Sequence, residues 1–185
     1  MNTRPLNQYI RTHTGRMFWP MDARPEEVSI EDIAHALSNC CRWAGHCESF
    51  YSVAQHSVFV SSLLPAVCSL EGLLHDATEA YLVDVPRPVK VLLGGYVEAE
   101  SRLMSVIADA FGLIMPISKD VKAADNLALF CERKELFHCG SAEEVLTQDA
   151  SICAGSLGGI PSIGEPLRPR EAKAAFMARF ETLKR

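Results

Sequence analysis

Long apolar segments are missing from this sequence. No apolar run approaches the roughly 18–20 residues that span a bilayer, and the first residues lack the apolar stretch of a signal peptide. We therefore expect no membrane partner. The seven cysteines include no C-x-x-C pair, and several fall within apolar helical patterns. They are typical of reduced thiols, which predicts a cytoplasmic protein.

An excess of positive charge is also missing. Lys and Arg number 18 against 23 Asp and Glu, which gives a formal net charge of −5. A chain without a broad basic surface is not expected to bind a nucleic-acid polymer. The 185 residues are 48% hydrophobic and 22% charged, which is typical of one globular domain with a sizeable core. We expect a small-molecule partner.

Alternating β patterns are absent, whereas apolar residues recur with helical spacing. The pattern predicts an all-α fold of about six helices. The first expected helix begins at residue 29. The other five cover 52–65, 67–82, 96–111, 118–137 and 170–183. Residues 1–28 are expected to be irregular, because prolines and a glycine interrupt them. Residues 139–169 are expected to form a loop of a length that is often functional, interrupted by a short helix at 141–147.

Helix signals support several of these boundaries. Ser29 with Asp32 resembles a capping box, and Ser52 with Gln55 forms an S-x-x-Q capping box. Gly112 is the expected C-terminal stop of the helix at 96–111.

Polar residues interrupt the stretch LLHDATEAYLVDVPRPVK, residues 73–90. Because residues three and four apart share a helix face, Glu79 is expected on the side that carries His75 and Asp76. Adjacent His75 and Asp76 are close enough to reach one metal ion, and a neutral imidazole with a carboxylate is a common ligand pair. Taken alone, the pair is a weak signal, and a solvated helix face is the favoured interpretation.

Two isolated polar residues favour the metal interpretation. His56 lies one turn into the capped helix at 52–65, where the alternative is a core histidine bonded to the backbone. Asp125 lies in the apolar stretch VKAADNLALF, where burial is costly unless the carboxylate is paired or coordinates a metal. With His75 and Asp76 they give four candidate ligands from three helices.

Three segments resemble a known superfamily: CRWAGHCESFYSVAQHS, LLHDATEAYLVDVPRPVK and VKAADNLAL. They are similar to the HD phosphohydrolases, in particular to bacterial 5'-deoxynucleotidases and to a prophage and phage branch that includes dATP triphosphohydrolases. The resemblance covers residues 29–135, and further residues fall in register: Arg42, Trp43, Glu79, Asp84 and Lys90.

The resemblance implies a compact HD-domain helical bundle, with residues 1–185 as a single domain and 29–135 as its metal-site core. It implies that His56, His75, Asp76 and Asp125 hold one divalent metal. Two imidazoles and two carboxylates suit Mn²⁺, Co²⁺, Fe²⁺ or Zn²⁺ better than Ca²⁺. A triphosphate substrate would bring a second ion, Mg²⁺. By analogy with relatives, a homo-oligomer is expected.

The resemblance also implies roles for the residues in register. Glu79 and Asp84 orient or deprotonate the attacking water and assist the leaving oxygen. Arg42 neutralises phosphate charge, and Lys90 adds a second positive charge. Trp43 packs on deoxyribose and excludes a 2'-hydroxyl. Each residue also has a purely structural alternative. Glu79 would be an acid on a helix face and Asp84 an acid in a turn. Lys90 would be an exposed lysine, and Trp43 a half-buried packing residue.

The expected function is removal of the 5'-phosphate from deoxynucleoside monophosphates in a metal-dependent reaction. The few cations at 141–152 favour monophosphates. A dNTP triphosphohydrolase, of which a dATP-selective enzyme is one form, is the alternative. A non-catalytic nucleotide-sensing module is disfavoured, because every candidate ligand and both acids are present.

Overall fold

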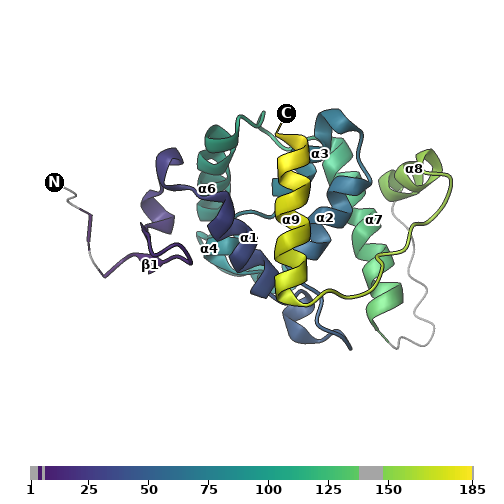
Figure 1. The fold of residues 1–185 in the computed structure, drawn as a ribbon, viewed down its shortest axis with the longest axis horizontal. Coiled ribbons are helices and arrows are strands. Elements are labelled where there is room, and N and C mark those ends of the chain that lie inside the picture. Colours follow the sequence, from purple (N-terminus) through teal and green to yellow (C-terminus); the bar gives the residue numbers. More distant parts are fainter. Residues whose placement is uncertain (1–3, 6, 138–147, 185) are drawn as a thin grey trace.

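The structure, a computed structural model, describes residues 4–5, 7–137 and 148–184 and is all-α apart from one small hairpin (Figure 1). The helices are α1 (Ile30–Asn39), α2 (Val53–Ser62), α3 (Ala66–Leu74), α4 (Glu79–Leu82), α5 (Arg87–Lys90), α6 (Tyr96–Phe111), α7 (Lys119–Leu136), α8 (Gln148–Ser156) and α9 (Pro169–Leu183). The predicted all-α fold is confirmed. In the described ranges, no helix is long and apolar enough to cross a membrane.

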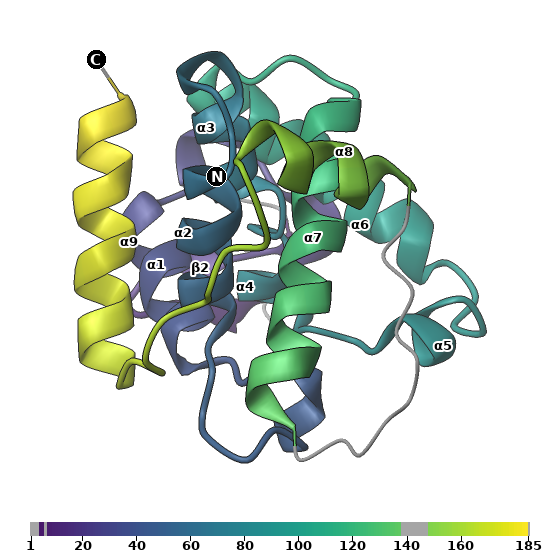
Figure 2. The ribbon, with the colours of Figure 1, turned by 90° about the vertical axis from the view of Figure 1, so that its right-hand side faces the viewer.

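Helix α2 lies at the centre of the molecule. It packs against α1, α3, α7 and α9. In Figure 2, α9 lies on one side of α2 and α7 on the other. Val53 and Ala54 belong to an apolar cluster that also contains Phe176 of α9, whereas Val60 belongs to a second cluster with Leu127 of α7. His56 lies on α2 among these packed helices, which explains its complete burial.

The predicted end of α6 forms as expected, and the predicted capping box at the start of α2 forms in part. Ser52 caps α2, because its Oγ accepts a hydrogen bond from the backbone N–H of Gln55 at 3.1 Å. Gln55 does not complete the box: its side chain bonds the backbone of Glu165 and Leu167 instead. Gly112 ends α6 in the left-handed conformation, as predicted.

The capping box predicted at the start of α1 is wrong. The side chain of Ser29 makes no cap hydrogen bond. Asp32 is buried and instead accepts bonds from the backbone N–H and the hydroxyl of Thr14, at 2.7 and 2.8 Å. These bonds anchor the turn of the hairpin between β1 (Ile10–Arg11) and β2 (Met17–Phe18) to α1. The described part of residues 1–28 is thus less irregular than expected.

The single helix predicted for residues 67–82 is broken in two. Helix α3 ends at Leu74, and α4 begins at Glu79. Between them, Ala77 N–H donates to Leu74 O and Glu79 N–H to Asp76 O, both at 3.0 Å. This three-residue spacing is tighter than the α-helical ladder. The break falls on His75 and Asp76, so the two candidate ligands lie in a turn.

The predicted loop 139–169 contains a helix in its described part, since α8 covers Gln148–Ser156. The short helix predicted at 141–147 falls outside the described residues. Helix α8 packs against α7, on the side visible at the right of Figure 1. Helix α5 was not predicted either. It follows Pro86 and contributes to the cavity described below.

Candidate metal centre and adjoining cavity

His56, His75 and Asp125 converge from α2, the turn after α3, and α7. One potential ligand atom from each lies within 4.8 Å of the other two, so the group could hold a metal ion. The Nε2 atoms of the two histidines are 3.3 Å apart. Asp125 Oδ1 lies 3.3 Å from Nε2 of His56 and 3.8 Å from Nε2 of His75. Ligands about 2.1 Å from a shared ion lie roughly 3.0–3.5 Å apart. Two of the three separations fit this range, and the distance from Asp125 to His75 is slightly longer.

The hydrogen bonds of the two imidazoles fix which nitrogen faces the centre. His75 Nδ1 lies 2.8 Å from the carbonyl oxygen of Gly72, which can only accept. His56 Nδ1 lies 2.5 Å from Oε1 of Glu132. In the neutral rings both Nδ1 atoms therefore donate, and both Nε2 lone pairs face each other and Asp125. Such a cluster of acceptors requires positive charge at its centre, from a metal ion or from protons.

Asp76 approaches the same centre. Its Oδ2 lies 3.2 Å from Nε2 of His75 and 3.5 Å from Nε2 of His56. It does not belong to the mutually close group of three. Burial by itself would raise the pKa of Asp76, but the neighbouring His75 and His56 lower it to about 2. The carboxylate is ionised at neutral pH, as a metal ligand must be.

Protons balance the charge of this centre when no metal is bound. Burial by itself would lower the pKa of His75, but Asp76 and Asp125 raise it well above the ordinary value. Burial and Arg42 lower the pKa of His56, and the carboxylates outweigh them, so it too is raised. A metal ion must therefore displace protons from the imidazoles.

We expect the stability of the metal-free protein to fall as pH rises from 6 to 9. A histidine with a raised folded pKa contributes stability below its unfolded pKa, near 6.5, and loses it as pH rises through the folded value. His56 and His75 both act in this direction. Asp76 and Asp125 have lowered pKa values, and their contribution is constant across this range. Thermal unfolding in EDTA measures the trend.

Added Mn²⁺ should reverse that trend, because fewer protons compete at higher pH. The rise in melting temperature should be larger at pH 8 than at pH 6. A metal-free melting temperature that rises with pH, or an Mn²⁺ effect that shrinks with pH, would contradict this assignment.

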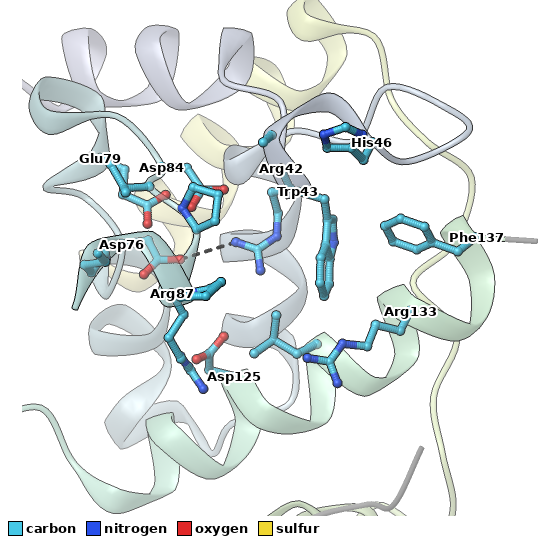
Figure 3. A pocket seen from close by; sticks show the side chains of 16 residues that line it. Arg42, Trp43, His46, Asp76, Glu79, Asp84, Arg87, Asp125, Arg133 and Phe137 are labelled. Atoms are coloured by element: carbon cyan, nitrogen blue, oxygen red, sulfur yellow. Dashed lines mark ion pairs between the residues drawn. The ribbon is translucent and has the colours of Figure 1, made fainter. Parts of the chain in front are cut away.

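Glu79 and Asp84 flank the centre on the side of the cavity (Figure 3). Glu79 is buried, and its Oε2 has no hydrogen-bond partner among the described residues. Burial, then Asp76 and Asp84, raise the pKa of Glu79 well above its ordinary value. Asp84 follows Val83, whose φ of 67° turns the chain sharply after α4. An unpartnered buried carboxyl oxygen beside a cavity marks a place for a ligand or a water.

A cavity of about 620 Å³ opens beside the metal centre. Asp76 and Asp125 form one part of its wall, with Glu79 and Asp84 next to them (Figure 3). Four cationic side chains also line it: Arg42, Arg87, Lys90 and Arg133. The remaining wall is aromatic and apolar, with a further histidine: Trp43, Ala44, His46, Val85, Pro86, Pro88, Leu129 and Phe137.

Arg42 joins the metal centre to the cavity. Its Nε donates to Oε2 of Glu132 at 3.0 Å, and one terminal nitrogen lies 3.6 Å from Oδ2 of Asp76 (Figure 3). Burial would lower the pKa of this guanidinium, but Glu132 and Asp76 outweigh it and raise the pKa above the ordinary value. Arg42 is therefore a buried, permanently charged group at the edge of the candidate metal site.

Trp43 lies in a strained turn beside Arg42. Its φ is 58° and that of Ala44 is 51°, values that non-glycine residues seldom adopt away from functional sites. Its Nε1 donates to Oε2 of Glu132 at 3.1 Å. The indole meets Phe137 edge to face at 5.3 Å, and Cζ of Arg133 lies 5.4 Å from the ring. The predicted contact residue is thus a fixed part of the cavity wall.

Lys90 lines the cavity as well, but its ammonium group also forms an ion pair with Glu100. Its Nζ lies 2.7 Å from Oε1 of Glu100 on α6 and above the ring of Tyr96. Arg87 and Arg133, which sequence reasoning did not single out, add cationic side chains to the same cavity. His46 also lines it.

Glu132 is a further residue of the site that sequence reasoning missed. It lies seven residues, about two turns, after Asp125 on α7 and is completely buried. Its carboxylate contacts His56, Arg42 and Trp43. Burial would raise the pKa of Glu132, but His56 and Arg42 hold it below the ordinary value. The available signal was the helical spacing from Asp125, which places both acids on one face.

Comparison with known proteins gives two relatives of nearly the same length. No family model matches the sequence. The chain is 41% identical over 180 residues to "Uncharacterized protein YfdR" of Escherichia coli (strain K12), with 95% of each chain covered. It is 35% identical over 192 residues, again with 95% of each covered, to "Uncharacterized protein RCAP_rcc00048" of Rhodobacter capsulatus. On this identity and coverage, the chain belongs to the same family as YfdR and its R. capsulatus relative.

Proposed function

We propose that this protein is a metal-dependent phosphohydrolase that removes the 5'-phosphate from deoxynucleoside monophosphates. The observation that carries the proposal is the contact between a candidate metal centre and a cavity that contains both a buried arginine and two carboxyl groups. This combination serves hydrolysis of a phosphate ester, in which an anion must be bound and a water activated. The segments that resemble HD phosphohydrolases contain these same residues.

His56, His75, Asp76 and Asp125 would hold one divalent ion, with Mn²⁺, Co²⁺, Fe²⁺ and Zn²⁺ suited to two imidazoles and two carboxylates. A cation fits here because the Nε2 lone pairs of His56 and His75 face each other. When bound, the ion supplies Lewis acidity toward a phosphoryl oxygen and lowers the pKa of water.

The chain's own groups divide the remaining work. Arg42 keeps its charge while buried, so it can bind a phosphate with paired hydrogen bonds. Glu79 has a free carboxyl oxygen beside Asp76, which places it to orient a water or take its proton. Asp84 lines the same wall and is placed to assist the leaving 5'-oxygen. The Trp43 ring offers a flat surface for deoxyribose.

A dNTP triphosphohydrolase is the second candidate, because of the additional cations of the cavity. Arg87 and Arg133 line it besides Arg42 and Lys90, and they suit a longer phosphate chain. A triphosphate would bring Mg²⁺ as a second ion. The loop 141–152, on which the sequence argument for monophosphates rested, lies largely outside the described residues. A homo-oligomer stays a prediction, and a non-catalytic sensing module stays the disfavoured alternative.

A substrate screen separates these candidates. Protein loaded in turn with Mn²⁺, Co²⁺ or Zn²⁺ is incubated with all dNMPs, NMPs and dNTPs, and the products are identified by chromatography. We expect phosphate and deoxynucleoside from dNMPs, and little reaction with NMPs, because the proposed packing of Trp43 on deoxyribose would exclude a 2'-hydroxyl. Tripolyphosphate from dNTPs would establish the second candidate. Metal-loaded protein that hydrolyses no nucleotide would contradict both.

A further inference from the structure

Glu132 binds three residues of the candidate site at once. Its Oε1 lies 2.5 Å from Nδ1 of His56, and its Oε2 accepts from Arg42 Nε at 3.0 Å and from Trp43 Nε1 at 3.1 Å. Its side chain is completely buried, where an ionised carboxylate is tolerated only when paired and hydrogen-bonded. Each partner belongs to a different part of the site: the metal centre, the proposed phosphate contact and the aromatic wall.

We propose that Glu132 is a positioning residue that sets the metal ligand His56 and the substrate contacts Arg42 and Trp43 through one carboxylate. This inference rests on the proposed function for the roles of Arg42 and Trp43, but not for the metal centre itself. Glu132 does not line the cavity, so it acts through the residues that it holds.

The effect on His56 concerns the choice of ring nitrogen. A carboxylate that accepts from Nδ1–H leaves Nε2 as the lone-pair nitrogen toward His75 and Asp125. Glu132 also fixes the orientation of the Arg42 guanidinium. With Nε held by Glu132, a terminal nitrogen points to Asp76, at the edge of the metal centre (Figure 3).

The effect on Trp43 is to hold a strained turn. The positive φ of Trp43 and Ala44 costs free energy, and the indole bond to Glu132 offsets part of it. Because one carboxylate serves all three partners, a change at Glu132 must alter the metal centre and the cavity wall together. A residue that only stabilised the fold would alter neither in protein that remains folded.

Glu132→Gln tests this with little change in volume. If the amide oxygen keeps the bonds from Arg42 and Trp43, the amide –NH₂ group faces Nδ1 of His56. That nitrogen must then accept, which places the proton on Nε2, where the metal should bind. We expect Mn²⁺ affinity, measured by calorimetry, to fall by about 10–100-fold. If the amide turns the other way, the bonds to Arg42 and Trp43 are lost instead.

Trp43 provides the second readout. The chain has only two tryptophans, so in a Trp19→Phe background the emission reports Trp43 alone. We expect Glu132→Gln to make this emission more accessible to acrylamide quenching in metal-free protein. The matched control is Glu135→Gln on the same helix, since Glu135 bonds Ser162 and Ile163, away from the site. It should leave both readouts unchanged.

The outcomes separate this inference from the proposed function. If Glu132→Gln retains both wild-type Mn²⁺ affinity and wild-type Trp43 quenching, the positioning role is wrong, whatever the activity. If the wild type hydrolyses no nucleotide while Glu132→Gln still alters these readouts, the proposed function fails and the positioning role stands. Should Glu132→Gln not fold, Glu132→Asp applies the same test. Its carboxylate falls short by one methylene, so wild-type values in both readouts would again overturn the proposal.

Discussion

Asp125→Asn is expected to reduce Mn²⁺ binding by at least about 100-fold and to lower hydrolysis of deoxynucleotides to background. A ligand contributes more than the residues that orient it, whose loss already costs about 10–100-fold. Asp125 Oδ1 lies close to Nε2 of both histidines and supplies the anionic ligand from α7. The amide has nearly the same size but no charge, so the variant tests coordination more than packing.

Calorimetry with Mn²⁺ and a phosphate-release assay measure the two losses in the Asp125→Asn protein. Asp120→Asn is the matched control, because Asp120 lies exposed in the first turn of the same helix. It should bind Mn²⁺ and react as the wild type does. Wild-type Mn²⁺ affinity in Asp125→Asn would remove Asp125 from the metal centre.

Arg42→Ala is expected to lower the free energy of unfolding by about 3–5 kcal/mol, as the loss of one partner from a buried ion pair does. The guanidinium is the cation that faces Oε2 of the completely buried Glu132, and without it that charge is only partly compensated. It also lies 3.6 Å from Asp76, so the variant removes a positive charge from the neighbourhood of both acids. We expect loss of nucleotide hydrolysis as well, because Arg42 is the proposed phosphate contact.

Urea denaturation in EDTA measures the stability loss of Arg42→Ala without a contribution from metal binding. Arg133→Ala is the control, since Arg133 lines the same cavity but is exposed. Its effect on stability should stay within about 1 kcal/mol, as for surface charges. A loss below about 1 kcal/mol in Arg42→Ala would show that Glu132 does not depend on this pairing.

The residues that the sequence predicted correctly to converge are those that break a strong local pattern. His56 follows the Ser52 cap by four residues, which fixed its place on a helix where the apolar residues Val53, Phe59 and Val60 flank it. Asp125 interrupts the apolar face of α7 in the same way. A polar residue on a buried helix face is a strong signal, because its burial is costly without a partner.

What could not be predicted depends on contacts between distant segments. Asp32 suggested a helix cap, yet it bonds Thr14 of the hairpin, a partner that local sequence does not reveal. Helix α3 ends at Leu74, and the Nδ1 of His75 bonds the carbonyl of Gly72, although the apolar pattern continues to Leu82. The bond between Asp32 and Thr14 is a tertiary contact that overrides a local capping preference, whereas the bond of His75 to Gly72 lies within a single turn.

Glu132 was missed for a related reason. In sequence it is followed directly by Arg133, Lys134 and Glu135, and such a run of charges is typical of the solvated end of a helix. Those three residues are indeed exposed, whereas Glu132 is completely buried. The partners of Glu132 are 76 to 90 residues away in the chain, so the fold alone brings them together.

The most direct test of the central claim is a crystal structure of the Mn²⁺-loaded protein with an anomalous difference map. We predict one peak per chain, within about 2.0–2.3 Å of Nε2 of His56, Nε2 of His75 and a carboxylate oxygen of Asp125, with Asp76 completing the set. Both Nδ1 atoms should keep their bonds to Glu132 and Gly72. A peak elsewhere, or an ion bound without both histidines, would contradict the account.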